Sequence, residues 1–360
     1  MNKIVTILGA RPQFVKAAVL SRIIVLHSEL EEVIVHTGQH FDANMSAIFF
    51  KEMEIPKPKY NLDINGLGHG AMTGQMLEKI EKVLLIEKPN AVIIYGDTNS
   101  TIAGALAAKK LNIKVVHIEA GLRSYNMKMP EEINRILTDR ISDLLLCPTE
   151  TAINNLNSEG FSNIDTKIVK CGDIMKDAVE FYSQSSAEKS SILDQLSLRN
   201  NEFVLATIHR QENTDDLDKL KSIFKGLENI SAKCQVVLPL HPRTRKILKE
   251  HKLSYNIKLI DPVGYFDMLE LLKHCKMVVT DSGGLQKEAF FNKKHCIIAR
   301  EETEWIELIE NGFANIVGSD SAKIEKAFYD FNKSTADFSI DLYGNNVGEK
   351  IYKEINNLLN

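Results

Sequence analysis

Charged side chains that could transfer protons follow several apolar runs in this chain, most densely between residues 115 and 135. Glu119 ends the apolar run VVHI, and a loop containing glycine leads to Pro130, a residue suited to the first turn of a helix. Glu131 comes next, and Arg135 lies one helical turn further along the same face. Such a group of acids and cations could exchange protons with a ligand. A surface ion-pair network is the structural alternative.

A second carboxylate, Asp97, follows another apolar run in the segment YGDTNST, residues 95–101. Asp is a good N-cap residue, so Asp97 could serve only to begin the next helix. The three residues after it can cap that helix without it, because each carries a hydroxyl or amide group: Thr98, Asn99 and Ser100. The pattern therefore favours a chemical role for Asp97.

Candidate anion-binding groups occur in two other segments of the first half. GARPQFVK, residues 9–16, follows the first apolar run and begins a helix whose N-terminus, with Arg11 and Lys16, can hold an anion. HTGQH, residues 36–40, places Gln39 after the second run. Neither segment is a dinucleotide fingerprint or a P-loop, and surface turns use the same residue types.

In the second half, two histidines follow apolar runs. ATIHRQENTDD carries His209 beside Arg210, and PLHPRTR carries His241. Histidine titrates near neutrality, so it can exchange protons or hold a phosphate. A structural histidine is the usual alternative for a single one, but the arginine beside His209 favours a functional role.

The segment VVTDSGGLQKEA, residues 278–289, gives the clearest physical indication of a ligand. An apolar run ends in Asp-Ser-Gly-Gly, and a helical pattern begins there. Gly283 and Gly284 let backbone N–H groups approach a phosphate, Ser282 adds a hydroxyl, and the helix dipole favours negative charge. Glu288, about one turn later, could accept hydrogen bonds from both hydroxyls of a ribose. A purely structural Gly-Gly turn is the alternative.

The apolar runs before these groups are continuous and rich in β-branched residues, as in parallel strands covered on both faces. They predict six strands in the first half and six in the second: Lys3–Gly9, Glu32–Thr37, Ala91–Gly96, Lys114–Ile118, Leu144–Pro148 and Lys167–Cys171, then Phe203–Ile208, Gln235–Pro239, Ile257–Ile260, Met277–Thr280, His295–Ala299 and Asn315–Val317.

Helical patterns between these strands indicate an α/β protein with two doubly wound, Rossmann-like domains facing a cleft. A polar stretch, Phe181–Glu202, separates the two sets of strands. We expect an N-terminal domain over residues 1–180, a C-terminal domain over 200–343, and a final helix within 344–360 that could pack back on the first domain.

Composition restricts the function classes. The 360 residues suit two domains, and the net charge of −4 with a pI near 6.2 argues against a nucleic-acid or anionic-membrane partner. No apolar run is long enough to cross a bilayer. The five cysteines contain no CxxC pair, so they indicate neither a disulfide framework nor a zinc site, and we expect a cytoplasmic location.

The ordered set of motifs resembles the non-hydrolysing UDP-N-acetylglucosamine 2-epimerase family. GARPQFVK, TGQH, GDTNST, HIEAGLR, PEEINR, the histidine-arginine pair and DSGGLQKEA occur in that order over nearly the whole chain. The resemblance implies the two-domain fold of B-type glycosyltransferases, with UDP held mainly by the second domain. It also implies a homodimer and requires no metal or other cofactor.

Carried over to this sequence, the family's site residues fall into two groups. The resemblance implies a catalytic group of Asp97, Glu119, Glu131 and His209. It implies substrate-binding residues at Arg11, Lys16, Gln39, Arg123, Arg135, Arg210, His241, Tyr265, Ser282, Gly283, Gly284 and Glu288.

The family chemistry matches these residue types. UDP is eliminated across C1 and C2 of the sugar, and the glycal takes it back after reprotonation on the other face. C2–H is a weak acid, so a positioned base, a second proton donor and cations on the leaving diphosphate are needed. The sequence leaves open which carboxylate removes the proton.

Several segments resemble one branch of the family. REETEWIELIENG, residues 300–312, has Trp-Ile where family members usually have Arg-Pro. YGDTNST, MKMPEEINR and LPLHPRTR also resemble the branch that acts on UDP-2,3-diacetamido-2,3-dideoxy-glucuronate for surface polysaccharides. That substrate carries a C6 carboxylate, for which Arg123 and Lys128 are candidate partners. The parent activity, on UDP-N-acetylglucosamine, is the alternative.

Three other protein classes remain as alternatives. A B-type glycosyltransferase would share the second domain, but it would need an acceptor-lined first domain, where carboxylates cluster here. An NAD-dependent dehydrogenase is disfavoured because the glycine fingerprint is missing. A catalytically inactive UDP-sugar sensor would have no need for the four catalytic residues together.

Overall fold

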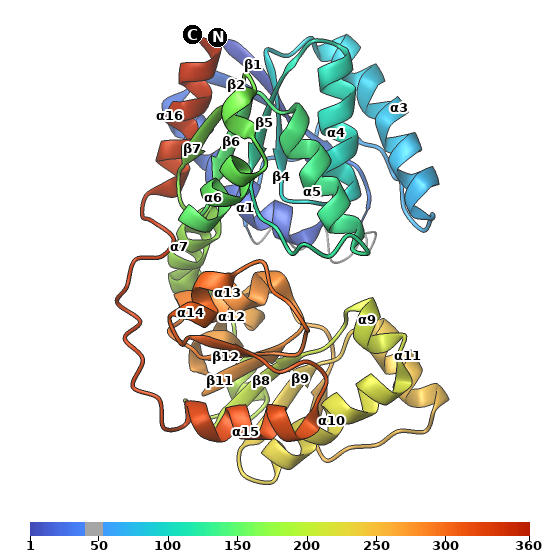
Figure 1. The fold of residues 1–360 in the computed structure, drawn as a ribbon, viewed down its shortest axis with the longest axis vertical. Coiled ribbons are helices and arrows are strands. Elements are labelled where there is room, and N and C mark those ends of the chain that lie inside the picture. The colour runs from blue at the N-terminus through green and yellow to red at the C-terminus, as the bar shows by residue number, and fades with distance from the viewer. Residues whose placement is uncertain (40–52) are drawn as a thin grey trace. The chain divides into compact units, whose positions relative to one another are not determined.

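Contacts within the chain divide the structure, a computed structural model that describes residues 1–39 and 53–360, into two units. Unit 1 comprises Met1–Glu180 and Asp341–Asn360, and unit 2 comprises Phe181–Ile340 (Figure 1). The boundary between them falls within one helix, α7 (Ile174–Lys189).

Unit 1 is built on a seven-stranded parallel sheet with the order β3-β2-β1-β4-β5-β6-β7. The order reverses between β1 and β4, as in doubly wound folds. The strands are β1 (Asn2–Leu8), β2 (Leu30–His36), β3 (Tyr60–Asn61), β4 (Ala91–Tyr95), β5 (Lys114–Ile118), β6 (Leu144–Cys147) and β7 (Lys167–Lys170).

Helices cover both faces of this sheet. Alternate side chains of β1 and β4 pack against α3 and α4, where Gly104 lets Ile7 and Ile94 approach α4 closely. The helices of unit 1 are α1 (Arg11–His27), α3 (His69–Glu87), α4 (Asn99–Lys110), α5 (Pro130–Ile141), α6 (Glu150–Ser158), the 3₁₀ turn η1 (Phe161–Asn163), the first part of α7, and α16 (Val347–Leu359).

Unit 2 repeats the arrangement on a six-stranded parallel sheet with the order β10-β9-β8-β11-β12-β13. Its strands are β8 (Phe203–Thr207), β9 (Gln235–Pro239), β10 (Lys258–Ile260), β11 (Met277–Thr280), β12 (Cys296–Ile298) and β13 (Ala314–Ile316). Its helices, after the end of α7, are α8 (Ile192–Gln195), α9 (Gln211–Thr214), α10 (Leu217–Ser231), α11 (Pro242–Glu250), α12 (Tyr265–His274), α13 (Gly283–Phe291), α14 (Ile306–Glu310) and α15 (Ser321–Phe331).

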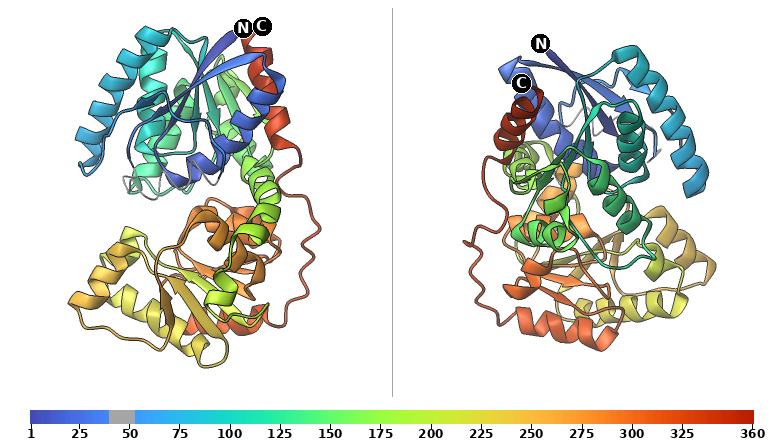
Figure 2. Two further views of the ribbon diagram at one scale, coloured as in Figure 1. Left: turned by 180° about the vertical axis from the view of Figure 1, so that it is seen from behind. Right: turned by 45° about the horizontal axis from the view of Figure 1, so that its top comes forward.

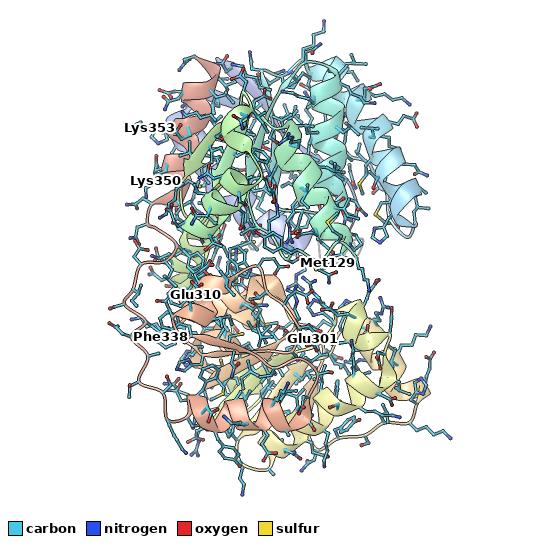
Figure 3. The ribbon with its side chains drawn as sticks, in the orientation of Figure 1. Met129, Glu301, Glu310, Phe338, Lys350 and Lys353 are labelled. Atoms are coloured by element: carbon cyan, nitrogen blue, oxygen red, sulfur yellow. The ribbon has the colours of Figure 1, made fainter. Side chains whose placement is uncertain are left out.

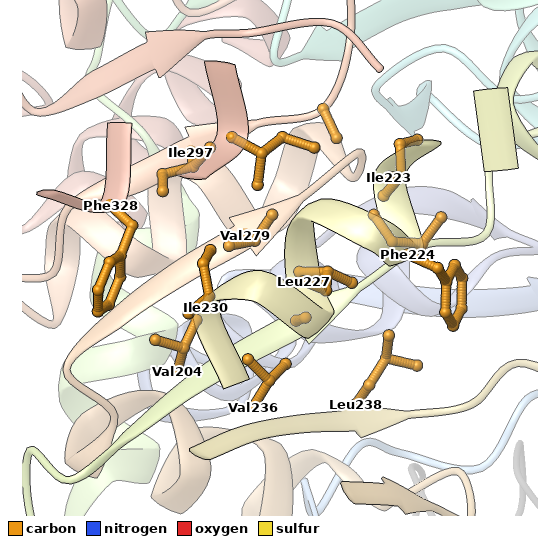
Figure 4. Close-up of a cluster of buried hydrophobic side chains, with 14 of the residues drawn as sticks. Val204, Ile223, Phe224, Leu227, Ile230, Val236, Leu238, Val279, Ile297 and Phe328 are labelled. Atoms are coloured by element: carbon orange, nitrogen blue, oxygen red, sulfur yellow. The ribbon is translucent and has the colours of Figure 1, made fainter. Parts of the chain in front are cut away.

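The core of unit 2 lies between its sheet and the helices α10 and α15. Phe224 and Leu227 of α10 and Phe328 of α15 pack on Val204 and Val279 of the central strands, and all five are at most 3% exposed (Figure 4). Burying side chains of this size contributes about 1.5–3 kcal/mol each. The strands that carry the candidate site residues are therefore held rigidly.

The predicted α/β class and all twelve predicted strands are confirmed, with ends that shift by no more than two residues. Within residues 1–39 and 53–360 the additional strand is β3, which pairs Tyr60 and Asn61 with Val35 and His36 at the edge of the sheet. Its two residues are too few to form an apolar run, so it left no signal in the sequence.

The polar stretch expected to separate the domains is part of unit 2 rather than a linker. Tyr182 is 2% exposed and packs edge-on against the ring of Tyr265. The Ser186 hydroxyl donates a hydrogen bond of 2.7 Å to the buried carboxylate of Glu270. These buried contacts are made by residues with polar groups. Composition alone therefore made the stretch look like an exposed linker and predicted a second domain that starts near residue 200.

The last helix, α16, packs on α1 within unit 1, where the two chain termini lie close together (Figure 2). Gly348 sits against Val19 and Ile23 of α1, and the ring of Tyr352 stacks on that of His27 with centroids 4.7 Å apart. The opposite side of the helix carries exposed lysines, Lys350 and Lys353 (Figure 3).

Among residues 1–39 and 53–360, none of the helices is long and apolar enough to cross a membrane.

Candidate active site

The carboxyl ends of three adjacent strands in unit 1 lead to the residues predicted from the first half of the sequence. β1, β4 and β5 are neighbours in the sheet. Arg11, Asp97 and Glu119 follow these strands within three residues. Parallel strands end at the same edge of a sheet, which is where open α/β folds bind ligands.

Asp97 is held by helix α5 and remains partly accessible. Arg135 Nη2 donates a hydrogen bond of 2.5 Å to Asp97 Oδ2, and Asn134 Nδ2 donates one of 2.9 Å to the Asp97 carbonyl oxygen. The Asp97 side chain is 29% exposed. The N-cap of α4 is Thr98, whose hydroxyl accepts from the Thr101 N–H. Capping is therefore not the role of Asp97.

Glu119 begins the loop after β5 in a left-handed backbone conformation, with φ of 71°. Such a conformation costs a non-glycine residue about 1–3 kcal/mol and is one kind of strain that clusters at functional sites. Its carboxylate forms an ion pair with Lys16 of α1, and both side chains are largely buried. Gly96 makes room for this pair, because a Cβ atom there would lie 3.1 Å from Glu119 Oε2.

Two adjacent glutamates at the start of α5 have different environments. Glu132 is 0% exposed and accepts hydrogen bonds from the Ser124 N–H, the Tyr125 N–H and Arg135 Nη1. It therefore fixes the loop that precedes the helix. Glu131 is only partly buried, and it forms no hydrogen bond or ion pair with the other residues that the structure describes. Its carboxylate therefore has no structural role among these residues.

Two glutamines join the remaining turns at this edge. Gln13 accepts from the Gly9 and Ala10 N–H groups and donates to the Tyr95 carbonyl oxygen at 2.8 Å. Gln39 Oε1 accepts from the backbone N–H and the hydroxyl of Ser100. His40, from the same motif as Gln39, lies outside the described residues. Arg11 occupies the first position of α1, half-buried at the helix N-terminus.

Arg123 is surrounded by carboxylates in the interior of unit 1. Its side chain is 0% exposed, with Nη1 2.7 Å from Asp139 Oδ2 and two further bonds to Glu159. A guanidinium with no exposed surface has no atom left for a substrate. We therefore reassign Arg123 from substrate binding to holding the loop that follows Glu119.

In unit 2, a buried aspartate orders the turn that carries His209 and Arg210. Asp281 is 0% exposed and follows β11. Its Oδ2 accepts from the His209 and Arg210 N–H groups at 3.0 and 2.9 Å and from Asn213 Nδ2 at 3.1 Å. The His209 side chain is 41% exposed, and its ring centroid lies 5.8 Å from that of His241, the N-cap residue of α11.

The Ser282-Gly283-Gly284 turn begins helix α13. Neither glycine has a positive φ, so the backbone conformation does not require glycine at these positions. A Cβ atom on Gly284 would meet no described atom within 4 Å. The absence of side chains instead leaves the helix N-terminus open, which suits the close approach of a phosphate. This favours the functional explanation over a purely structural turn.

Glu288 and Tyr265 belong to the same side of unit 2. Glu288 is half-buried on α13, and Tyr265 is 4% exposed at the start of α12. Burial raises the pKa of Tyr265 well above its ordinary value, and the negative charge of Glu288 raises it further. The tyrosine is therefore neutral at physiological pH.

Arg300 is a buried cation that the sequence analysis did not single out. Its side chain is 0% exposed and binds Glu304 at 3.0 Å, with Glu212 3.7 Å away. Burial opposes its charge, but the two carboxylates outweigh that effect, so the pKa of Arg300 lies above its ordinary value. A Cβ atom on Gly283 would lie 3.6 Å from Glu304 Oε2 and 3.9 Å from both Arg300 and Arg210, so two guanidinium groups and one carboxylate flank this turn.

Each unit offers distinct chemistry. Unit 1 presents carboxylates beside fixed cations, an arrangement suited to proton transfer. Unit 2 presents backbone N–H groups, arginines and a partly exposed histidine, an arrangement suited to a phosphate-bearing ligand. Within the described ranges, 1–39 and 53–360, no cluster of three or more His, Cys, Asp or Glu side chains could hold a metal ion.

Comparison with known proteins identifies the family. The family profile described as UDP-N-acetylglucosamine 2-epimerase matches residues 24–356. The chain therefore belongs to the UDP-N-acetylglucosamine 2-epimerase family, whose members are isomerases.

Individual relatives differ in their named substrates. The chain is 55% identical over 318 residues, 88% of each chain, to the UDP-2,3-diacetamido-2,3-dideoxy-D-glucuronate 2-epimerase of Pseudomonas aeruginosa. It is 43% identical to the UDP-N-acetylglucosamine 2-epimerase of Methanocaldococcus jannaschii, covering 90% of this chain and 91% of the relative. The solved structure of a Methanocaldococcus jannaschii UDP-GlcNAc 2-epimerase with UDP-GlcNAc and UDP matches with a TM-score of 0.91, at 41% identity and 99% coverage of both chains.

Proposed function

We propose that this protein inverts C2 of a UDP-2-acetamido sugar without hydrolysing it. We further propose that the substrate is UDP-2,3-diacetamido-2,3-dideoxy-α-D-glucuronate and the product its manno-uronate epimer. The observation that carries the reaction type is the pair of carboxylates, Asp97 and Glu119, each beside a buried cation at one sheet edge. Family membership and the 55% identical relative support the substrate.

The reaction proceeds by elimination and re-addition. A carboxylate of unit 1 removes the C2 proton, and the C–H electron pair forms the C1=C2 double bond. The bond from C1 to the diphosphate oxygen breaks, and UDP leaves with that electron pair. A proton then returns to C2 on the opposite face, and the UDP oxygen attacks C1 again. The net result is an inverted C2, with no oxidation and no added water.

The residues of unit 1 divide this work. Asp97 and Glu119 are ion-paired to Arg135 and Lys16, so each carboxylate has a fixed orientation. Glu131, which forms no hydrogen bond with the other described residues, supplies the third acid–base group. Rates of single variants at these three positions would identify the group that removes the C2 proton.

The residues of unit 2 bind UDP in this proposal. The open N-terminus of α13 and the guanidinium of Arg210 receive the diphosphate, whose charge increases as the C1–O bond breaks. Glu288 accepts hydrogen bonds from the ribose hydroxyls. His209, held by its backbone on Asp281, exchanges a proton during the reaction.

The substrate proposal needs a cation for the C6 carboxylate. Since Arg123 is buried, the remaining candidate on the loop between Glu119 and Glu131 is Lys128, which is exposed. Among the described residues its ammonium group has no ion-pair partner, so it is available to a ligand. A carboxylate paired with charge and hydrogen bonds is worth about 1.5–3 kcal/mol, which corresponds to roughly 10- to 10²-fold in kcat/KM.

Two experiments test the proposal. Turnover in deuterated water, followed by proton NMR, should place deuterium at C2 of the sugar. Product with undiminished C2 protium would exclude the elimination mechanism. Competition between the diacetamido-uronate nucleotide and UDP-N-acetylglucosamine in one tube gives the ratio of kcat/KM values directly. A ratio near one would contradict the proposed substrate preference and would instead support UDP-N-acetylglucosamine 2-epimerase activity, as named for the relative from Methanocaldococcus jannaschii.

We also propose a cytoplasmic homodimer that serves surface polysaccharide synthesis. All five cysteines are free thiols, as is usual in a reducing compartment. Ile133 and Leu137, one turn apart on α5, are 41% and 51% exposed, and apolar side chains of this size on one helix face suit a subunit contact. Light scattering during gel filtration should give twice the chain mass of 40.5 kDa. A single-chain mass would contradict the dimer.

A further inference from the structure

His117 lies on β5, two residues before Glu119, and has no exposed surface. Its two ring nitrogens each contact an oxygen atom. Nε2 is 2.7 Å from the carbonyl oxygen of Gly96, and Nδ1 is 2.7 Å from Oδ1 of Asp139. These distances are those of strong hydrogen bonds, so the ring is fixed at both ends.

The contact with Gly96 fixes the direction of one of these bonds. A carbonyl oxygen only accepts hydrogen bonds, so Nε2 is the donor to Gly96. Nδ1 and the carboxylate of Asp139 share the other bond. The ring therefore bridges the turn after β4 and helix α5.

The surroundings of Asp139 hold its carboxylate in place. Burial alone would raise the pKa of Asp139, but the hydrogen bonds and charges of His117 and Arg123 outweigh burial and hold it below its ordinary value. Arg123 Nη1 lies 2.7 Å from Asp139 Oδ2, and both side chains have no exposed surface. Glu159, which pairs with the other side of Arg123, lies at the surface.

The same ring joins the segments that carry two of the catalytic carboxylates. Gly96, whose carbonyl oxygen it binds, immediately precedes Asp97 and has a φ of 60°. Asp139, which it binds at the other end, also accepts a hydrogen bond of 3.2 Å from the Gly121 N–H, in the loop after Glu119. A shift of the ring would therefore move both turns.

We propose that His117, held between the Gly96 carbonyl oxygen and Asp139, is a positioning residue that sets the placement of the carboxylates of Asp97 and Glu119. The proposal rests on the function proposed above, because it assigns a purpose to the alignment of these groups in C2 proton transfer. His117 touches no substrate. It acts through the Gly96 carbonyl oxygen and the Asp139 carboxylate.

A pair of substitutions separates the two contacts of the ring. In His117→Gln the amide nitrogen takes the place of Nε2 and can still donate to Gly96. In His117→Asn it takes the place of Nδ1, so the bond to Gly96 is lost. Misplacing a catalytic group by about 1 Å can cost roughly 10²-fold in rate. We expect His117→Asn to lower kcat by about 10²-fold with little change in KM, and His117→Gln to retain most of kcat.

Controls keep this comparison interpretable. His251→Asn, an exposed position at the end of α11, should leave kcat unchanged. Thermal melts followed by circular dichroism show whether each variant is folded. Equal losses of kcat in the Asn and Gln variants, or no loss in either, would overturn the positioning role. If the wild-type protein exchanges no C2 hydrogen with any UDP-sugar, the proposed function itself fails.

Nitrogen-15 NMR of the histidine rings tests the contact with Gly96 without any turnover. The wild-type spectrum should contain a ring with a protonated, hydrogen-bonded Nε2, a signal that disappears in His117→Gln. An unprotonated Nε2 at that position would overturn the positioning role, whether or not the His117 variants fold well enough for kinetics.

Discussion

Asp97 and Asp281 occupy equivalent places in the two units, yet the structure uses them in opposite ways. Each follows the strand beside the reversal of strand order, β4 in one sheet and β11 in the other. Asp97 is 29% exposed and is held by one guanidinium. Asp281 is 0% exposed and is occupied by N–H donors from the neighbouring turn. One carboxylate is kept available for chemistry, and the other is used to build the loop that carries His209.

The difference shows how the two units form their sites. Unit 1 supports its reactive groups through side chains such as Arg135, Lys16 and His117, so single substitutions there should change catalysis. Unit 2 presents backbone N–H groups, so its geometry depends on buried structural residues such as Asp281. Four predictions test this contrast.

The largest effect is expected at Asp97. Asp97→Asn keeps an acceptor for Arg135 but removes the charge and the basic oxygen. Glu131→Gln likewise removes the charge and the basic oxygen of the third acid–base group. We expect kcat to fall by about 10²-fold or more in each variant, the usual scale for a positioned acid or base. The free energy of unfolding should change by about 1 kcal/mol or less. Initial rates and urea titration measure both quantities, and a near-normal rate would remove that residue from the mechanism.

Asp281→Ala should show the reverse pattern. The substitution leaves three donors without an acceptor: the partly buried N–H groups of His209 and Arg210, and the buried Asn213 Nδ2. An unsatisfied buried group costs about 1–3 kcal/mol, so unit 2 should lose about 1–3 kcal/mol of stability. Urea titration monitored by circular dichroism should show this loss. A variant as stable as the wild type would mean that Asp281 is not the element that orders this turn.

Ser282→Ala and Glu288→Ala should weaken nucleotide binding without affecting the fold. Each removes one hydrogen-bonding group worth about 0.5–1.5 kcal/mol, so we expect UDP to bind roughly 3- to 10-fold more weakly. Calorimetric titration with UDP alone measures the change. Ser222→Ala, on α10 away from the turn, serves as the control. Unchanged affinity in both site variants would argue against UDP binding at the N-terminus of α13.

The smallest effect concerns Glu87, a carboxylate of unit 1 that is paired with cations far from the site. It binds Lys3 at the amino end of β1, the edge opposite to Arg11. Hydrogen bonds from Lys59, Tyr60 and Lys3 hold the pKa of Glu87 at about 2, below its ordinary 4.5. The stabilisation is therefore complete above pH 4.5 and is lost as the pH falls toward 2.

Unfolding of the wild type and of Glu87→Gln across this pH range measures that contribution. The difference between the two proteins should be constant near pH 7 and should shrink below pH 4.5. kcat should be unaffected at neutral pH, because Glu87 lies at the opposite edge. A loss of activity in this variant would contradict the assignment of Glu87 as a purely structural carboxylate of unit 1.

Much of the fold could be predicted from the sequence, because strands covered on both faces are recognisable as continuous apolar runs. The positions of Asp97 and Glu119 followed from the same runs, since each comes at a strand end. The use of each polar side chain could not be predicted, because it depends on contacts between distant segments. Glu131 and Glu132 are adjacent, yet one is buried among four donors and the other is not. The sequence predicts Arg123 as a ligand-binding cation, whereas in the structure Asp139 and Glu159 surround its guanidinium group.

Helix α16 has a consequence for the order in which the protein folds during synthesis. Unit 2 is continuous in sequence, whereas unit 1 needs residues 341–360 as well as 1–180. While the ribosome is still translating unit 2, the surface of α1 around Val19 and Ile23 has not yet received Gly348, and the turn at Gly172 lacks its contact with Tyr343. The unit that is made first is therefore the one completed last, and a nascent chain needs protection over that surface until its final residues emerge.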